Sequence, residues 1–102
     1  MKHCRLTHIR SLDQLYDELA RQLGFPGHFG RNLDALWDTL TTDVEGPVEI
    51  VWEDPEHSQS SLGDEYARVV ALLEEVAEER GDMTLEFLPG EKPKGTKRLT
   101  AK

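Results

Sequence analysis

The sequence predicts an α/β domain built on a small parallel sheet. Three short segments rich in β-branched or other apolar residues are typical of strands, and segments with apolar residues at helical spacing separate them. The predicted order is strand, helix, helix, strand, short helix, helix, strand. This alternation of strands with connecting helices favours strands that run in the same direction. A length of 102 residues suits one such domain.

The first strand is expected over residues 2–8, and a helix is expected to follow it. Ser11 and Gln14 have the spacing of a capping box, which predicts that the helix begins after Ser11. Gly24 ends it, and Pro26 prevents it from resuming. Its buried face is predicted to comprise Leu12, Leu15, Tyr16, Leu19 and Leu23.

A glycine-rich loop over residues 24–31 precedes a second predicted helix. Asn32 is a suitable N-cap for a helix that covers residues 33 to about 41. The carboxylates of Asp34 and Asp38 are four positions apart, so they lie on one face of this helix. The apolar positions are Leu33, Leu36, Trp37 and Leu40.

The second half of the chain repeats the alternation of strand and helix. Residues 48–52 are β-branched and predict a central strand, and the polar residues 53–63 could hold a short helix. A long helix is expected over residues 64–80, because its apolar residues recur at helical spacing and Gly81 follows it. Residues 83–88 predict the last strand. The buried stripe of the long helix is Tyr66, Val69, Val70, Leu73, Val76 and Ala77.

Charge is unevenly distributed along the chain. Residues 1–90 contain 19 Asp and Glu against 7 Lys and Arg, a net charge of −12, whereas residues 91–102 contain one acid and five basic residues, a net charge of +4. We therefore expect an acidic folded body over 1–90 and a basic, flexible tail over 91–102. An acidic body repels nucleic acid and attracts basic partners, although acidity also serves solubility alone.

Several classes of protein are disfavoured by composition. No segment approaches the length of apolar chain needed to cross a membrane, and the first residues lack the apolar run of a signal peptide. Cys4 is the single cysteine, so an internal disulfide is impossible. These features lead us to expect a cytoplasmic protein that contacts no membrane.

Catalytic and cofactor sites are also poorly supported. His3, Cys4 and His8 are close in sequence, but on a strand they are more typical of a buried thiol and surface imidazoles than of a metal or nucleophile site. Asp34 and Asp38 could form a carboxylate pair, yet no nucleophile, oxyanion donor or metal-ligand spacing accompanies them. The glycines before the second helix do not follow a strand as a phosphate-binding loop does. We expect no catalytic residue, metal or cofactor.

The second predicted helix has the strongest binding signal. Asp34 lies in its first turn, where the helix dipole favours an anion, and Asp38 follows one turn later on the same face. Trp37 adds a large aromatic surface beside this acidic ridge, which we define as Asp34 and Asp38. Aromatic residues next to charges that need a partner are typical of interface hot spots. The alternative is an ordinary amphipathic helix with its acids in water and Trp37 in the core.

The same segment resembles the signature of a known family. The run HFGRNLDALWD, residues 28–38, is similar to the barstar family pattern, in which two aromatics, Gly and any residue precede Asn-Leu-Asp-Ala-Leu-Trp-Asp. Seven successive residues, from Asn32 to Asp38, are identical to that pattern. The element order also fits from about residue 2 to residue 88. The resemblance implies a three-stranded parallel sheet packed with helices, and non-catalytic inhibition of a small guanyl-preferring ribonuclease.

The resemblance also implies roles for individual residues. Asp38 matches the family's principal acid, which occupies the position of a substrate phosphate against the enzyme's arginines and histidine. Asp34 matches a second inhibitory acid, and Glu75 matches an acid on the last helix that pairs with a basic residue at the rim. His28 and Gly30 match loop positions that pack on the enzyme. Further contact positions are implied for Asn32, Leu33, Trp37, Val44 and Glu45.

The implied partner is a basic extracellular-type ribonuclease bound in a 1:1 complex, with no direct contact to nucleic acid. Its active site must hold a polyanion, so a carboxylate ridge on a rigid helix would act as a preorganised phosphate mimic. The chain departs from the family at three positions. His28 stands where the family usually has Tyr, Arg31 places a positive charge beside the ridge, and Asp43 stands where the founding member has Trp. An immunity or binding protein for a different basic toxin or nuclease, using the same helix, is therefore the alternative.

Overall fold

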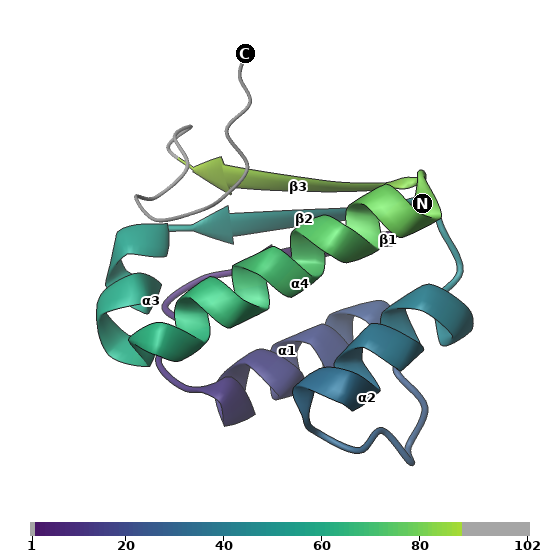
Figure 1. The fold of residues 1–102 in the computed structure, drawn as a ribbon, viewed down its shortest axis with the longest axis horizontal. Helices are drawn as coiled ribbons and strands as arrows, with labels where there is room; N and C mark the ends of the chain where they lie inside the picture. Colours follow the sequence, from purple (N-terminus) through teal and green to yellow (C-terminus); the bar gives the residue numbers. More distant parts are fainter. Residues whose placement is uncertain (1, 89–102) are drawn as a thin grey trace.

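The computed structural model describes residues 2–88 and has a three-stranded parallel sheet with helices along one face (Figure 1). The strand order is β1-β2-β3, so β2 is central, as its β-branched sequence predicted. The register aligns Cys4 with Ile50 and Ile50 with Leu85. The strands are β1 (Lys2–Leu6), β2 (Val48–Glu53) and β3 (Met83–Leu88).

The helices follow the predicted order. The segment 53–63 does hold a short helix, which sits where β2 leads into the long helix (Figure 1). The predicted tail, residues 91–102, lies outside the described residues, so the division of the chain near residue 90 stays a prediction. The helical elements are α1 (Leu12–Leu23), α2 (Leu33–Asp38), a π-helical turn η1 (Thr39–Asp43), α3 (Pro55–Leu62) and α4 (Asp64–Arg80).

Two predicted boundaries were wrong. The first strand ends at Leu6 and not at residue 8, because the chain turns at His8, whose φ of 55° is outside the extended region. The helix expected to end near Thr41 instead changes at Asp38 from α-helical to π-helical geometry and continues to Asp43. Helical periodicity in the sequence carries no signal for that wider turn.

Local capping explains why α1 begins and ends as predicted. The Ser11 side chain accepts a hydrogen bond from the Gln14 backbone N–H at 3.1 Å, and the Gln14 side chain reaches back to the Arg10 N–H at 2.8 Å. The first interaction satisfies a donor that a helix start leaves without an intrahelical partner, and the second ties the residue before the N-cap to the first turn. Gly24 ends the helix in the left-handed conformation, with φ of 73°, which glycine adopts without steric cost.

The core lies between the sheet and the helices α1, α2 and α4. Alternate residues of each strand are buried on this side, including Leu6, Ile50 and Trp52, all with no exposed surface. Trp52 is central to the packing: its ring meets Tyr66 of α4 edge to face, with centroids 5.3 Å apart. Its indole N–H donates to Ser58 Oγ of α3 at 2.9 Å, so this buried polar group has a partner.

A side chain of α1 occupies part of the β1 edge of the sheet. At β1, the Gln22 side chain of α1 accepts from the Arg5 N–H and donates to the Arg5 carbonyl, at 2.8 and 3.0 Å, as a neighbouring strand would.

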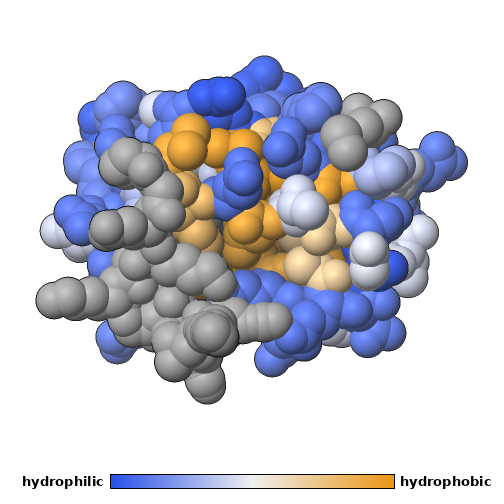
Figure 2. Space-filling view, turned by 90° about the horizontal axis from the view of Figure 1, so that it is seen from above, coloured by the Kyte–Doolittle hydropathy of each residue, from blue (hydrophilic) through white to orange (hydrophobic). Residues whose placement is uncertain are grey.

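Figure 2 shows the surface of the molecule from above the view of Figure 1. Apolar side chains gather in the middle of this surface, and hydrophilic side chains surround them. Within residues 2–88, Leu88 is the one exposed large hydrophobic residue, at 38%.

Candidate partner-binding surface

Asn32 positions both α2 and the loop before it. Its side-chain oxygen accepts a hydrogen bond from the Ala35 N–H at 2.7 Å, which caps the helix as predicted. Its side-chain nitrogen donates to the Gly30 carbonyl at 3.3 Å. A Cβ added at Gly30 would lie 3.2 Å from the Cβ of Ala35, so the loop approaches the helix closely. One side chain therefore couples the start of α2 to the glycine loop.

The two acids of the ridge are both exposed on α2. Asp34 lies in the first turn and Asp38 is the last residue of the α-helical part. Neither carboxylate has a hydrogen bond or ion pair with any residue between 2 and 88. Both charges are therefore available to an external cation and are held by a short helix whose backbone is already ordered.

Trp37 was expected either to face a partner or to lie in the core, and its side chain is placed to do both. Its side chain is half-buried and packs against the core, while part of it stays at the surface of the helix that carries the two acids of the ridge. The buried part holds the indole in place, so little conformational freedom would be lost if a partner covered the exposed part. The residue can therefore serve packing and binding together.

The π-helical turn that continues α2 is stabilised by its own threonines. Thr41 Oγ1 donates to the Trp37 carbonyl at 2.7 Å, and Thr42 Oγ1 donates to the Asp38 carbonyl at 2.5 Å. These bonds add side-chain donors to carbonyls at the junction between α2 and the π-helical turn. The turn thus keeps the backbone around Asp38 rigid.

Arg80, at the end of α4, secures the same turn from outside. Its side chain is only 9% exposed, and Nη1 donates to the carbonyls of Leu40 and Val44 at 2.8 and 2.9 Å. On the other side of the guanidinium, Arg80 Nε donates a hydrogen bond to Asp82 Oδ1 at 2.7 Å. The sequence showed Arg80 only as the end of a helix, and no local pattern indicates a bond to residues about forty positions away.

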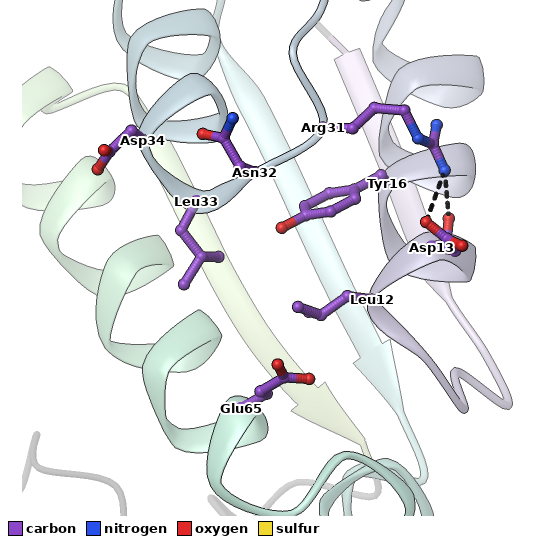
Figure 3. A pocket seen from close by; sticks show the side chains of 8 residues that line it. All are labelled: Leu12, Asp13, Tyr16, Arg31, Asn32, Leu33, Asp34 and Glu65. Atoms are coloured by element: carbon purple, nitrogen blue, oxygen red, sulfur yellow. Dashed lines mark hydrogen bonds and ion pairs between the residues drawn. The ribbon is translucent and has the colours of Figure 1, made fainter.

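Arg31 was expected to place its positive charge beside the acidic ridge, but its side chain pairs with α1 instead. Its guanidinium turns toward α1 and pairs with Asp17 at 3.0 Å and Asp13 at 3.3 Å. It also lies over the ring of Tyr16, 5.7 Å from the centroid. Figure 3 shows this side chain on the wall opposite Asp34. The expectation that Arg31 adds its charge to the ridge needs correction, because α1 already compensates that charge.

The other residues implied by the resemblance are spread around α2. His28 lies exposed in the loop before the helix, and Glu45 lies exposed after η1. Glu75 is exposed on α4, which packs against both α2 and η1. Leu33 is half-buried at the start of α2. Val44 is only 7% exposed, so its side chain offers little surface.

The described residues contain no arrangement suited to metal or thiol chemistry. Between residues 2 and 88 there is no group of three or more His, Cys, Asp or Glu side chains placed to hold a metal ion. Cys4 is 2% exposed, and burial raises the pKa of its thiol to about 12, so at neutral pH it is protonated and packed in the core. In this part of the chain no helix has the length and apolar character to cross a membrane.

The fold is a small α/β domain whose second helix displays carboxylates without partners among residues 2–88, a surface complementary in charge to a basic protein. The family model described as Barstar (barnase inhibitor) matches residues 1–88. The chain belongs to the barstar family, which confirms the resemblance carried by residues 28–38. This family comprises inhibitors and not enzymes, so the chain is a barnase inhibitor-like protein.

A curated relative from Bacillus subtilis (strain 168) supports the same assignment. It is named "Putative ribonuclease inhibitor YrdF" and is 40% identical to this chain over 72 residues. The aligned part covers 71% of this chain and 79% of the relative. The similarity therefore extends over most of both proteins.

Proposed function

We propose that this chain is a non-catalytic immunity protein that blocks the active site of a barnase-like, guanyl-preferring ribonuclease. The observation that supports this most directly is the pair of exposed carboxylates, Asp34 and Asp38, on a helix that Asn32 caps and Arg80 braces. In the proposed complex Asp38 takes the position of an RNA phosphate. Asp34 and Glu75 pair with basic residues nearer the rim of the active site.

Preorganisation is the physical basis of this phosphate mimicry. The cap at Asn32, the threonine bonds of η1 and the buried Arg80 side chain hold the backbone before the partner arrives. Association then orders few additional groups, so more of the electrostatic attraction contributes to affinity. A flexible acidic loop of equal charge would bind less tightly for this reason.

The acidity of the body favours rapid encounter with a basic enzyme. Residues 1–90 carry a net charge of −12, and the long-range field of such a surface speeds association with a cationic active site at low ionic strength. The proposed partner is an extracellular-type ribonuclease bound one to one. The proposed compartment is the cytoplasm, where a free cysteine such as Cys4 remains reduced and the cell's own RNA needs protection.

A titration of ribonuclease activity tests this function. RNA cleavage by barnase is followed with a fluorogenic substrate while the purified full chain is added in increments. Activity that falls linearly to zero at one equivalent supports a 1:1 active-site inhibitor. Undiminished cleavage at a large excess, together with no complex in gel filtration, contradicts the proposal for this enzyme. Binding to another basic nuclease in the same assay would support the alternative of a different target.

A further inference from the structure

Beside the acidic ridge, the structure has an open hollow of about 590 Å³ (Figure 3). It lies between the start of α1, the start of α2 and the start of α4. Leu12 and Leu33 form apolar walls, and Tyr16 lies between them. Asp34 is at one end of the hollow and Glu65 at the other. The hollow therefore shares Asn32, Leu33 and Asp34 with the surface proposed to face the ribonuclease.

Tyr16 presents the polar atom of this hollow that a ligand would contact. The residue is only 3% exposed, and its ring packs edge to face against Phe29 with centroids 5.6 Å apart. Its hydroxyl points into the space between Leu12 and Leu33 and has no hydrogen bond to any residue from 2 to 88 (Figure 3). Because it opens to the hollow, the hydroxyl is free to bond a ligand there. A polar group entering the hollow would meet a fixed donor and acceptor.

The charges around the hollow favour a cation. Glu65 is exposed in the first turn of α4, and its carboxylate has no hydrogen bond or ion pair within the described part of the chain. Arg31 is the one basic side chain in the lining, and Asp13 and Asp17 already pair with it. Burial, and then the negative charge of Glu65, raise the pKa of Tyr16.

We infer that this hollow is a second anchoring site, which receives a basic side chain of the ribonuclease. The ammonium or guanidinium group pairs with Glu65 and donates to the Tyr16 hydroxyl, while the aliphatic stem lies between Leu12 and Leu33. An acidic or neutral side chain would leave Glu65 without a counter-charge. The inference rests on the proposed function, since the enzyme seated over Asp34 is what brings the side chain within reach.

The first test uses barnase and two variants that alter the hollow in different ways. Tyr16→Phe removes the hydroxyl and keeps the ring against Phe29, whereas Glu65→Gln removes the charge. Glu56→Gln is the matched control, because Glu56 is also an exposed glutamate in the first turn of a helix. We expect each hollow variant to dissociate roughly three to ten times faster than wild type in surface plasmon resonance, and the control to dissociate like wild type.

Two outcomes of this experiment separate the hollow from the ridge. If both hollow variants dissociate like wild type while Asp38→Ala weakens the complex, the anchoring site is wrong and the inhibitor proposal stands. If wild type does not bind barnase, the proposed function fails for that enzyme. A measurement without the ribonuclease then tests whether the hollow binds a cation.

That measurement is an NMR titration of the full chain with N-butylguanidinium, which has the charge and the stem of a basic side chain. N-butylurea, a neutral compound of similar shape, is the control ligand. Saturable shifts of the Tyr16, Leu33 and Glu65 amides with the cation, reduced in Glu65→Gln and absent with the urea, are expected. Equal responses to both compounds, or no response to either, would overturn the inference.

Discussion

Arg80 donates a hydrogen bond through Nη1 to the carbonyl oxygen of Leu40 at 2.8 Å, which joins the end of α4 to the π-helical turn after α2. The same nitrogen reaches the Val44 carbonyl at 2.9 Å. The side chain is 9% exposed, so these bonds are largely shielded from water. Arg80 therefore holds the turn that follows the acidic helix, although it lies outside the surface proposed to contact the ribonuclease.

Replacing Arg80 by Met should destabilise the fold and weaken binding together. The change leaves the carbonyls of Leu40 and Val44 without their donor, which is expected to cost roughly 2–4 kcal/mol in the free energy of unfolding. Urea unfolding followed by tryptophan fluorescence measures this cost. Arg68→Met, at an exposed position of the same helix, is the control and should unfold like wild type. Equal stability of the two variants would contradict the bracing role.

Asp38→Ala should cause the largest single loss of ribonuclease binding. The substitution would leave basic groups of the enzyme buried without a counter-charge, and we expect a loss of roughly 2–5 kcal/mol or more, the general cost of truncating one partner of a buried charge pair. Isothermal titration calorimetry with barnase, or competition where affinity is too high, measures it. Glu56→Ala on α3 removes an equal charge far from α2 in the chain and should change affinity little. A loss under about 0.5 kcal/mol would remove Asp38 from the central position.

Ser58→Ala should lower the stability of the fold, because it leaves the buried indole N–H of Trp52 without an acceptor. Ser58 has no exposed surface, and its Oγ accepts from Trp52 Nε1 at 2.9 Å. Removing the hydroxyl should lower the free energy of unfolding by roughly 1–3 kcal/mol. Ser60→Ala, at an exposed position of the same helix, is expected to have no such effect. Thermal unfolding monitored by circular dichroism compares the two, and equal melting temperatures would argue against the hydrogen bond.

The stability of the protein should fall in acid partly through Asp82 and Glu18. The Arg80 guanidinium holds the pKa of the Asp82 carboxyl below its usual value of 3.8, and hydrogen bonds from Gln22 and then Arg21 hold the pKa of Glu18 below 4.5. Because the unfolded chain binds these protons at higher pH than the folded one, the stabilisation is present above the ordinary values and is lost as the pH falls through the lowered ones.

Urea unfolding at pH 7, 5, 4 and 3 checks this dependence. The variants Asp82→Asn and Glu18→Gln cannot titrate at these positions, so each should lose less stability than wild type between pH 5 and pH 3. Thr84→Ala, at an exposed position on β3, serves as a control that leaves both carboxyls in place. If each acid variant loses as much stability as wild type over this range, the two carboxyls do not contribute to the acid response.

Most of the fold could be predicted because its signals are local. The capping pair Ser11 and Gln14, the cap at Asn32 and the glycine that ends α1 act within one helical turn, and the structure confirms all of them. The resemblance over residues 28–38 predicted the family for a similar reason, since it lies in one uninterrupted run. The roles given there to individual contact residues stay predictions.

Longer-range features could not be predicted from these patterns. The π-helical turn after Asp38 accepts, through the Leu40 carbonyl, a hydrogen bond from Arg80, which lies at the end of α4, and Arg80 also bonds the Val44 carbonyl just after the turn. Arg31 was expected near the ridge, yet two carboxylates of α1 draw its guanidinium away. In both cases the partner is distant in sequence, so no spacing rule connects the residues.

The sequence by itself determined the order of the elements, the helix starts and the pair of acids one turn apart, because each depends on neighbours within a few residues. The tertiary structure decided which charges remain uncompensated. Packing α1 beside the loop before α2 neutralises Arg31 and leaves Asp34 and Asp38 exposed without partners among residues 2–88. The same packing brings Tyr16 and Glu65 to one hollow, since side chains from three helices meet there only after the core has formed.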